Sequence, residues 1–92
     1  MRMTYSQFEE ELLVAIVKTA DANSAADPNS LGQVDVMVVA SEVSPCASEQ
    51  LVRSVVGRFK GLGWVCNVVE PISGGIWLMV TGDGRRKAES LG

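Results

Sequence analysis

The side chains best suited to recognise a charged partner lie together in one run of the chain. Its polar members are Ser48, Gln50, Arg53, Ser54, Arg58 and Lys60. Arginine and glutamine can present two hydrogen-bonding groups at once to the edge of a base, and cations gain affinity for nucleic acid by releasing condensed counterions. The chemistry that these residues offer is therefore recognition of a polyanion rather than the making or breaking of bonds.

The sequence contains none of the residue constellations that catalysis or metal binding needs. It has no histidine, Cys46 and Cys66 stand apart without a CxxC pair, and no GxxxxGK[ST] loop is present. Glu9, Glu10 and Glu11 fall near the start of a helix, where the helix dipole accounts for them. We therefore expect no enzyme, no metal, cofactor or small-molecule ligand, and two reduced thiols packed as small apolar groups.

Composition indicates one globular domain covering residues 1–92. A content of 47% hydrophobic and 21% charged residues is typical of a folded protein, and the apolar runs are far shorter than the ~20 residues that span a bilayer. We expect a cytoplasmic protein without a membrane segment. In residues 1–47 seven acids oppose two cations, whereas in residues 48–92 six cations oppose four acids. The net charge of -3 weakens the case for a basic face without excluding it.

A helix must position the polar run if its side chains are to share a face. Ser44 or Ser48 can cap this helix, and Gly61 or Gly63 can adopt the left-handed conformation that ends it. At 100° per residue the apolar side consists of Leu51, Val52, Val55, Val56, Phe59 and Leu62. The opposite side consists of Gln50, Arg53, Ser54, Gly57 and Gly61, flanked by Arg58 and Lys60.

Residues 4 to 22 have the pattern of a helix that is apolar on more than one side. Ser6 and Glu9 have the spacing of a capping box, and Thr4 is a competing cap. The main stripe consists of Tyr5, Phe8, Leu12, Ile16 and Ala20, widened by Leu13 and Val17. Val14 lies nearly opposite this stripe. Such a helix contacts two neighbours, and the second is either a dimer partner or another helix of the same domain.

The segment that follows is first a loop and then ambiguous. Residues 21 to 33 are rich in turn formers, with residues 27 to 30 the strongest turn signal. In "VDVMVVASEV", residues 34 to 43, the valines favour a strand. The spacing of Val36, Val39, Ala40 and Val43 instead fits a helix. Local sequence alone leans toward the strand.

Beyond the polar run the pattern becomes strand-like. The runs "WVCNVVE" and "IWLMVT" are separated by residues 71 to 75, whose glycines allow the positive φ of a hairpin turn. In the second run Trp77 and Met79 share one face, opposite Leu78. Thr81 then caps a last short helix, "GDGRRKAESL".

The order of these elements resembles the winged helix-turn-helix domain of bacterial transcription regulators over residues 34 to 92. The resemblance rests on the run "LVRSVVGRFKGLGWV", on the hairpin after it, and on "MVTGDGRRKAESL", which is similar to the tail after the wing. It implies a small α+β fold, a winged helix with a three-helix core, a β-hairpin wing and a short C-terminal helix. If residues 34 to 43 form a strand, the alternative is a two-layer α+β sandwich with a three-stranded sheet.

The resemblance also implies roles for the polar residues. It makes residues 34 to 43 the helix before recognition, residues 44 to 48 the turn, and residues 48 to 62 the helix that enters a major groove. The side chains that would approach base edges are Ser48, Glu49, Gln50, Arg53 and Ser54. Arg58 and Lys60 would lie nearer the sugar-phosphate backbone.

Two features depart from the family pattern. Residues 71 to 75, at the tip of the expected wing, contain no arginine or lysine, and Glu70 beside them would repel phosphate. The densest basic cluster, Arg85, Arg86 and Lys87, falls on the last helix, where it would form a solvated face that offsets the negative C-terminal end.

The residues are compatible with two functions. The first is a small sequence-specific regulator, a homodimer that binds duplex DNA through residues 48 to 60. The alternative is a winged-helix module that binds protein through Trp77 and Met79, or through the first helix, without a role in nucleic-acid binding.

Overall fold

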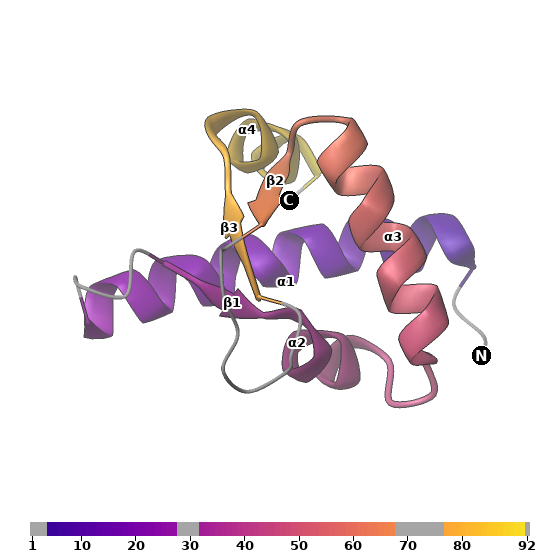
Figure 1. Ribbon diagram of the computed structural model, residues 1–92. Coiled ribbons are helices and arrows are strands. Elements are labelled where there is room, and N and C mark those ends of the chain that lie inside the picture. Colours follow the sequence, from indigo (N-terminus) through magenta and orange to yellow (C-terminus); the bar gives the residue numbers. More distant parts are fainter. Residues whose placement is uncertain (1–3, 28–31, 68–76, 92) are drawn as a thin grey trace.

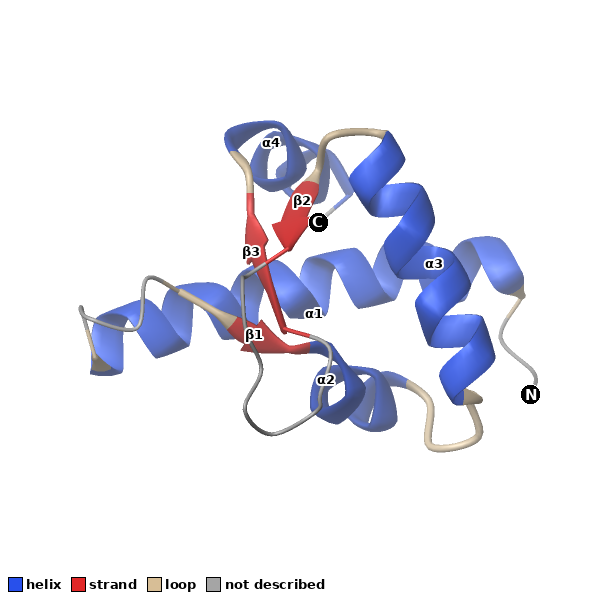
Figure 2. Cartoon of the chain, in the orientation of Figure 1, coloured by secondary structure: helices blue, strands red, loops and turns tan. Residues whose placement is uncertain are grey.

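The computed structural model describes residues 4–27, 32–67 and 77–91, and it confirms a small α+β fold (Figure 1). The elements are α1 (Tyr5–Ala26), β1 (Val34–Asp35), α2 (Val36–Val43), α3 (Glu49–Gly61), β2 (Val65–Asn67), β3 (Trp77–Val80) and α4 (Gly82–Leu91). The strands form one antiparallel sheet in the order β1-β3-β2. Figure 2 shows α1 running behind this small sheet, with α4 above, α2 below and α3 upright at one side.

Helix α1 begins at the competing cap, Thr4, and extends beyond its expected end. Thr4 is the cap: its hydroxyl accepts from the Gln7 amide at 3.1 Å, and the Gln7 side chain accepts from the Thr4 amide at 3.0 Å. The expected Ser6 and Glu9 box is wrong because the reciprocal pair forms two residues earlier, between Thr4 and Gln7. The loop expected from residue 21 is also wrong, since alanine-rich sequence continues the helix to Ala26. Most of the turn expected at residues 27 to 30 lies outside the described residues.

The ambiguous segment divides into a strand and a helix. Val34 and Asp35 pair with Leu78 and Trp77 of β3. The Asp35 carboxylate then accepts from the Met37 amide at 3.1 Å and caps α2. The strand interpretation is therefore wrong for residues 36 to 43, where the helix is confirmed, and the third strand of the sheet consists of only two residues.

The buried side chains form one cluster to which all four helices and the sheet contribute. From α1 the buried residues are Phe8, Leu12, Leu13, Ile16, Val17 and Ala20, which match the expected stripe except for Tyr5. Tyr5 is 48% exposed because it occupies the first helical position, beyond the edge of the core. From α3 they are Val52, Val55, Val56 and Phe59. The ring of Phe59 lies 5.7 Å from that of Trp64, between centroids.

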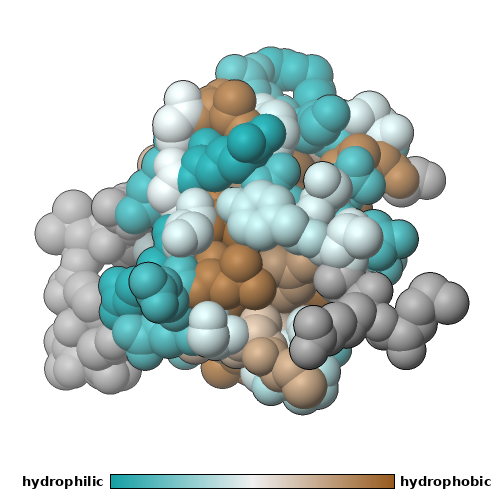
Figure 3. Space-filling view, turned by 90° about the vertical axis from the view of Figure 1, so that its right-hand side faces the viewer, coloured by the Kyte–Doolittle hydropathy of each residue, from teal (hydrophilic) through white to brown (hydrophobic). Residues whose placement is uncertain are grey.

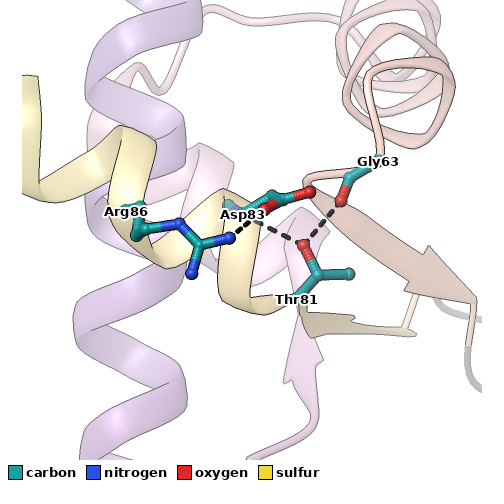
Figure 4. Close-up of polar contacts among 5 residues, drawn as sticks. Gly63, Thr81, Asp83 and Arg86 are labelled. Atoms are coloured by element: carbon teal, nitrogen blue, oxygen red, sulfur yellow. Dashed lines mark hydrogen bonds and ion pairs between the residues drawn. The ribbon is translucent and has the colours of Figure 1, made fainter.

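A single threonine joins the end of α3 to the start of α4 (Figure 4). Ser48, not Ser44, caps α3, and after it Gly63 takes a φ of 78°. The Thr81 hydroxyl donates to the Gly63 carbonyl at 2.6 Å and accepts from the Gly84 amide at 3.1 Å, which confirms Thr81 as the cap of α4. The Thr81 amide donates to the Trp64 carbonyl at 3.0 Å. The same residue thus fixes where two helices meet the sheet.

Gly84 allows α4 to lie directly against the start of β2. A Cβ atom at this position would lie 2.0 Å from the Trp64 carbonyl oxygen. No side chain fits such a distance without backbone movement. The close approach therefore requires glycine at residue 84, although the residue lies in a helix.

We predict that Gly84→Ala lowers the free energy of unfolding by about 1–3 kcal/mol or more, because the helix must move off the Trp64 carbonyl. Gly82→Ala is the matched control in the same helix, since its Cβ would only contact Arg86 at 3.8 Å. Urea unfolding of both variants checks the prediction, and equal losses would contradict it.

Candidate nucleic-acid interface

Helix α3 presents one face to the core and the other to solvent. The Ser48 hydroxyl accepts from the Leu51 amide at 3.1 Å and starts the helix. Glu49 lies in the first turn and Arg58 and Lys60 in the last, which complements the helix dipole. Leu62, expected on the apolar side, is 47% exposed because it follows the last helical turn. The buried valines and Phe59 thus orient the polar side outward.

All six residues predicted to contact DNA are exposed. They are Ser48, Gln50, Arg53, Ser54, Arg58 and Lys60. Figure 3 shows the flank that carries α3, where hydrophilic atoms surround patches of hydrophobic ones rather than form an unbroken band. The structure therefore brings the expected residues to one helix surface, on a flank that also exposes hydrophobic patches.

Arg53 forms an ion pair on its own helix. Its Nε lies 2.8 Å from a carboxylate oxygen of Glu49, one turn earlier, and both side chains are about 60% exposed. Exposed pairs at this spacing contribute only about 0.3–0.5 kcal/mol. Arg53 can therefore exchange this partner for a phosphate or a base at little cost.

Arg58 pairs with Glu9, which the sequence had suggested as part of a capping box. Its Nε lies 3.0 Å from Oε2 of Glu9 on α1, and the Glu9 side chain is only 14% exposed. That oxygen is buried and accepts no hydrogen bond, so the contact is a Coulombic one. One feature of the sequence could have indicated this pair. Arg58 lies beside the apolar face of α3, and a side chain at that position points toward a neighbouring helix. Arg58 is thus held against α1, whereas Lys60 makes no ion pair within the described part of the chain.

Each cation of the basic cluster on α4, Arg85, Arg86 and Lys87, contacts a partner within the described residues. Arg85 pairs with Asp21 of α1 and Arg86 with Asp83 of its own helix. The Lys87 ammonium lies 5.8 Å from the centre of the Trp64 ring, within range of a cation–π contact. None of these cations lies in the last turn of α4, so the expected compensation of its C-terminal end is wrong.

Trp77 and Met79 share one face of β3, as expected. Trp77 lies opposite Asp35 and Met79 opposite Cys66, while Leu78 is fully buried on the other face. Both Trp77 and Met79 are half-buried, so neither stands free as a large apolar anchor.

Cys66 and Cys46 are free and exposed, and the expectation that both thiols are packed is wrong. Cys66 lies on the outward side of β2, and Cys46 lies in the turn between α2 and α3.

Among residues 4–27, 32–67 and 77–91, no three histidine, cysteine or acidic side chains come close enough to hold a metal ion. No helix in these same ranges is both long and apolar enough to cross a membrane. No family model matches the chain, and no curated protein or solved structure matches it either.

We predict that Arg58→Met lowers the free energy of unfolding by roughly 1 kcal/mol, because it leaves the buried Glu9 carboxylate without a partner. The loss is limited because the Arg58 side chain is 60% exposed and water screens the pair. Adding Glu9→Gln should recover part of it, with a coupling of about 0.5–1 kcal/mol in a double-mutant cycle.

Arg53→Met is the matched control for this cycle, since it breaks an exposed pair on one helix. Its loss should stay below about 0.5 kcal/mol. If chemical unfolding gives the two single variants the same stability, Arg58 does not have the structural role assigned to it.

Proposed function

We propose that the chain is a winged helix-turn-helix domain that binds duplex DNA through the exposed face of α3, as a cytoplasmic transcription regulator. The observation that carries the proposal is the outward face of α3, where every polar residue from Ser48 to Lys60 is accessible. Its element order supports the fold assignment, since α2, a five-residue turn and α3 are followed directly by two paired strands. This is the order that the sequence resemblance requires.

The dimensions of α3 suit a major groove. An α-helix with its side chains is about 10–12 Å across, and the groove is about 12 Å wide. If the N-terminal half of α3 enters it, Gln50 can pair with adenine and Arg53 with guanine, each through two hydrogen bonds. Arg53 must first leave Glu49, and the exposed position of that pair makes the exchange inexpensive.

The charge of α3 sets a limit on affinity. Arg53 and Lys60 can reach phosphates, while Arg58 remains against Glu9. With at most these two phosphates neutralised per copy, the logarithm of the binding constant should fall by about 2 per logarithmic unit of salt. Such binding is modest, and its specificity would depend on base contacts from Gln50 and Arg53.

The alternative is a winged-helix module that binds protein without DNA. The pairing of Arg53 and Arg58 with glutamates favours it, as does the net charge of -3. The half-buried state of Trp77 and Met79 does not, because binding anchors are usually large side chains that a partner can enclose. DNA binding is therefore the function we propose.

We predict that NMR titration with mixed-sequence duplexes at low salt shifts the amide signals of Gln50, Arg53 and Lys60, because these residues lie on the binding face. Arg53→Ala should weaken binding several-fold, and the matched control Arg86→Ala should not. Arg86 is also an exposed arginine paired with an acid of its own helix, but it lies on α4. Absence of shifts on α3 would rule out the proposal. If Arg53→Ala and Arg86→Ala weakened DNA binding equally, the binding would depend on overall charge and not on the face of α3.

Gly57→Ala provides a second and independent prediction. A Cβ at this position would contact nothing within 4 Å, so alanine should stabilise the helix by up to about 1 kcal/mol. If the α3 backbone approaches DNA closely, the same methyl group should weaken DNA binding. In Gly57→Ala the free energy of unfolding should therefore rise while the affinity for DNA falls.

Gly61→Ala is the control, because its Cβ would also contact nothing within 4 Å but the residue lies at the C-terminal end of the helix. Unchanged DNA affinity in Gly57→Ala would argue against a close approach at this point.

A further inference from the structure

The outward face of α1 carries a shallow apolar depression. The depression has a volume of about 500 Å³ and lies between the C-terminal ends of α2 and α4, on the side of α1 that is turned away from the core. Val14 and Ala15 of α1 form its floor, with Val43 and Leu91 from the flanking helices, and all four are half-buried. Val14 is the residue whose position opposite the main stripe had indicated a second neighbour for α1. Helices α2 and α4 both contact α1, and these four side chains pack against the edge of the core cluster while they remain partly exposed.

Charged residues border the depression at both ends, with Glu10 and Glu11 at one end and Lys18 at the other. Glu11 lies three residues before Val14, and Lys18 lies three residues after Ala15. Glu11, Val14, Ala15 and Lys18 lie within about 100° of the helix circumference, so they form one stripe along α1. Glu11 and Lys18 are two turns apart, about 10 Å along the axis, too far to pair within one helix. The stripe therefore presents one negative and one positive end around an apolar centre.

We propose that this stripe, Glu11 to Lys18, is an isologous interface with a second copy of this chain. The two α1 helices lie antiparallel, with the two-fold axis passing between Val14 and Ala15. Residues equidistant from the axis then face each other, so Val14 of one copy packs near Ala15 of the other and Glu11 meets Lys18 twice. A two-fold interface requires this self-complementary order, whereas an unrelated partner does not.

The residue types fit this packing. Ala15 and Val14 are small enough for two helices to approach closely, and Val43 and Leu91 widen the apolar contact on both sides. Glu11 and Lys18 are exposed, so their pairs determine orientation and register more than affinity. Because the interface uses no residue from the outward face of α3, it stands independently of DNA binding.

The test is sedimentation equilibrium of the complete chain and two charge-reversal variants. The wild-type chain should dimerise. Glu11→Lys places lysine against lysine at both pairs, and Lys18→Glu places glutamate against glutamate, so each variant alone should dimerise about tenfold more weakly or worse. An equimolar mixture should recover the wild-type association, because a Glu11→Lys chain opposite a Lys18→Glu chain restores both pairs. This recovery can arise only between chains.

Two controls separate the proposal from simpler outcomes. Circular dichroism and thermal unfolding show whether the exposed variants remain folded, and Trp77→Ala should leave the association unchanged. A wild-type chain that stays monomeric at concentrations of about 1 mM, a mixture that associates no better than its components, or weakening by Trp77→Ala alone would each overturn the interface. DNA titrations of Lys18→Glu would still report on α3, so failure of this interface is distinguishable from failure of the proposed function.

Discussion

The orientation of α3 depends on the hydrogen bonds of Thr81. Its hydroxyl connects the carbonyl that ends the α3 turn, at Gly63, with the amide that starts α4, at Gly84. Because Gly84 has no side chain, α4 can lie on the Trp64 carbonyl and close the junction. The C-terminal end of the helix with the candidate binding face is thus held by residues that follow β2 in the sequence, while its buried residues orient it against the core. A change at this junction would displace α3 without altering any residue on its exposed face.

Helix α1 contributes both to the core and to ion pairs with α3 and α4. One side supplies the largest share of the core, and Glu9 at its edge holds Arg58 of α3. Asp21, nearer its end, pairs with Arg85 of α4. If the chain binds nucleic acid, these contacts compete with it for the cations of the chain, since a carboxylate that is mostly buried keeps its partner more firmly than an exposed one. The helix that stabilises α3 therefore also reduces the charge that α3 can offer.

Local physics was sufficient to predict the exposed face of α3, the paired strands of the hairpin and the Thr81 cap, because periodicity and capping act within a few residues. It was insufficient for β1, because two residues form a strand only through pairing with β3, far along the chain. Asp35 therefore ends a strand and caps a helix, which neither interpretation of residues 34 to 43 anticipated alone. The pairing of Arg58 with Glu9 was missed for the same reason, since it depends on how two helices pack.

The two proposals are linked by charge, although each can fail separately. Arg53 is paired weakly and Arg58 more firmly, and Lys60 is the cation of α3 without an ion pair among the described residues. One copy can therefore release few counterions, and its contacts with DNA would be short-lived. If the two α3 helices of a dimer joined through α1 both reached one duplex, the second contact would form at a high effective concentration. A weakly charged α3 would therefore bind DNA more tightly in such a dimer than in a single copy, while binding by a single copy does not require the α1 interface.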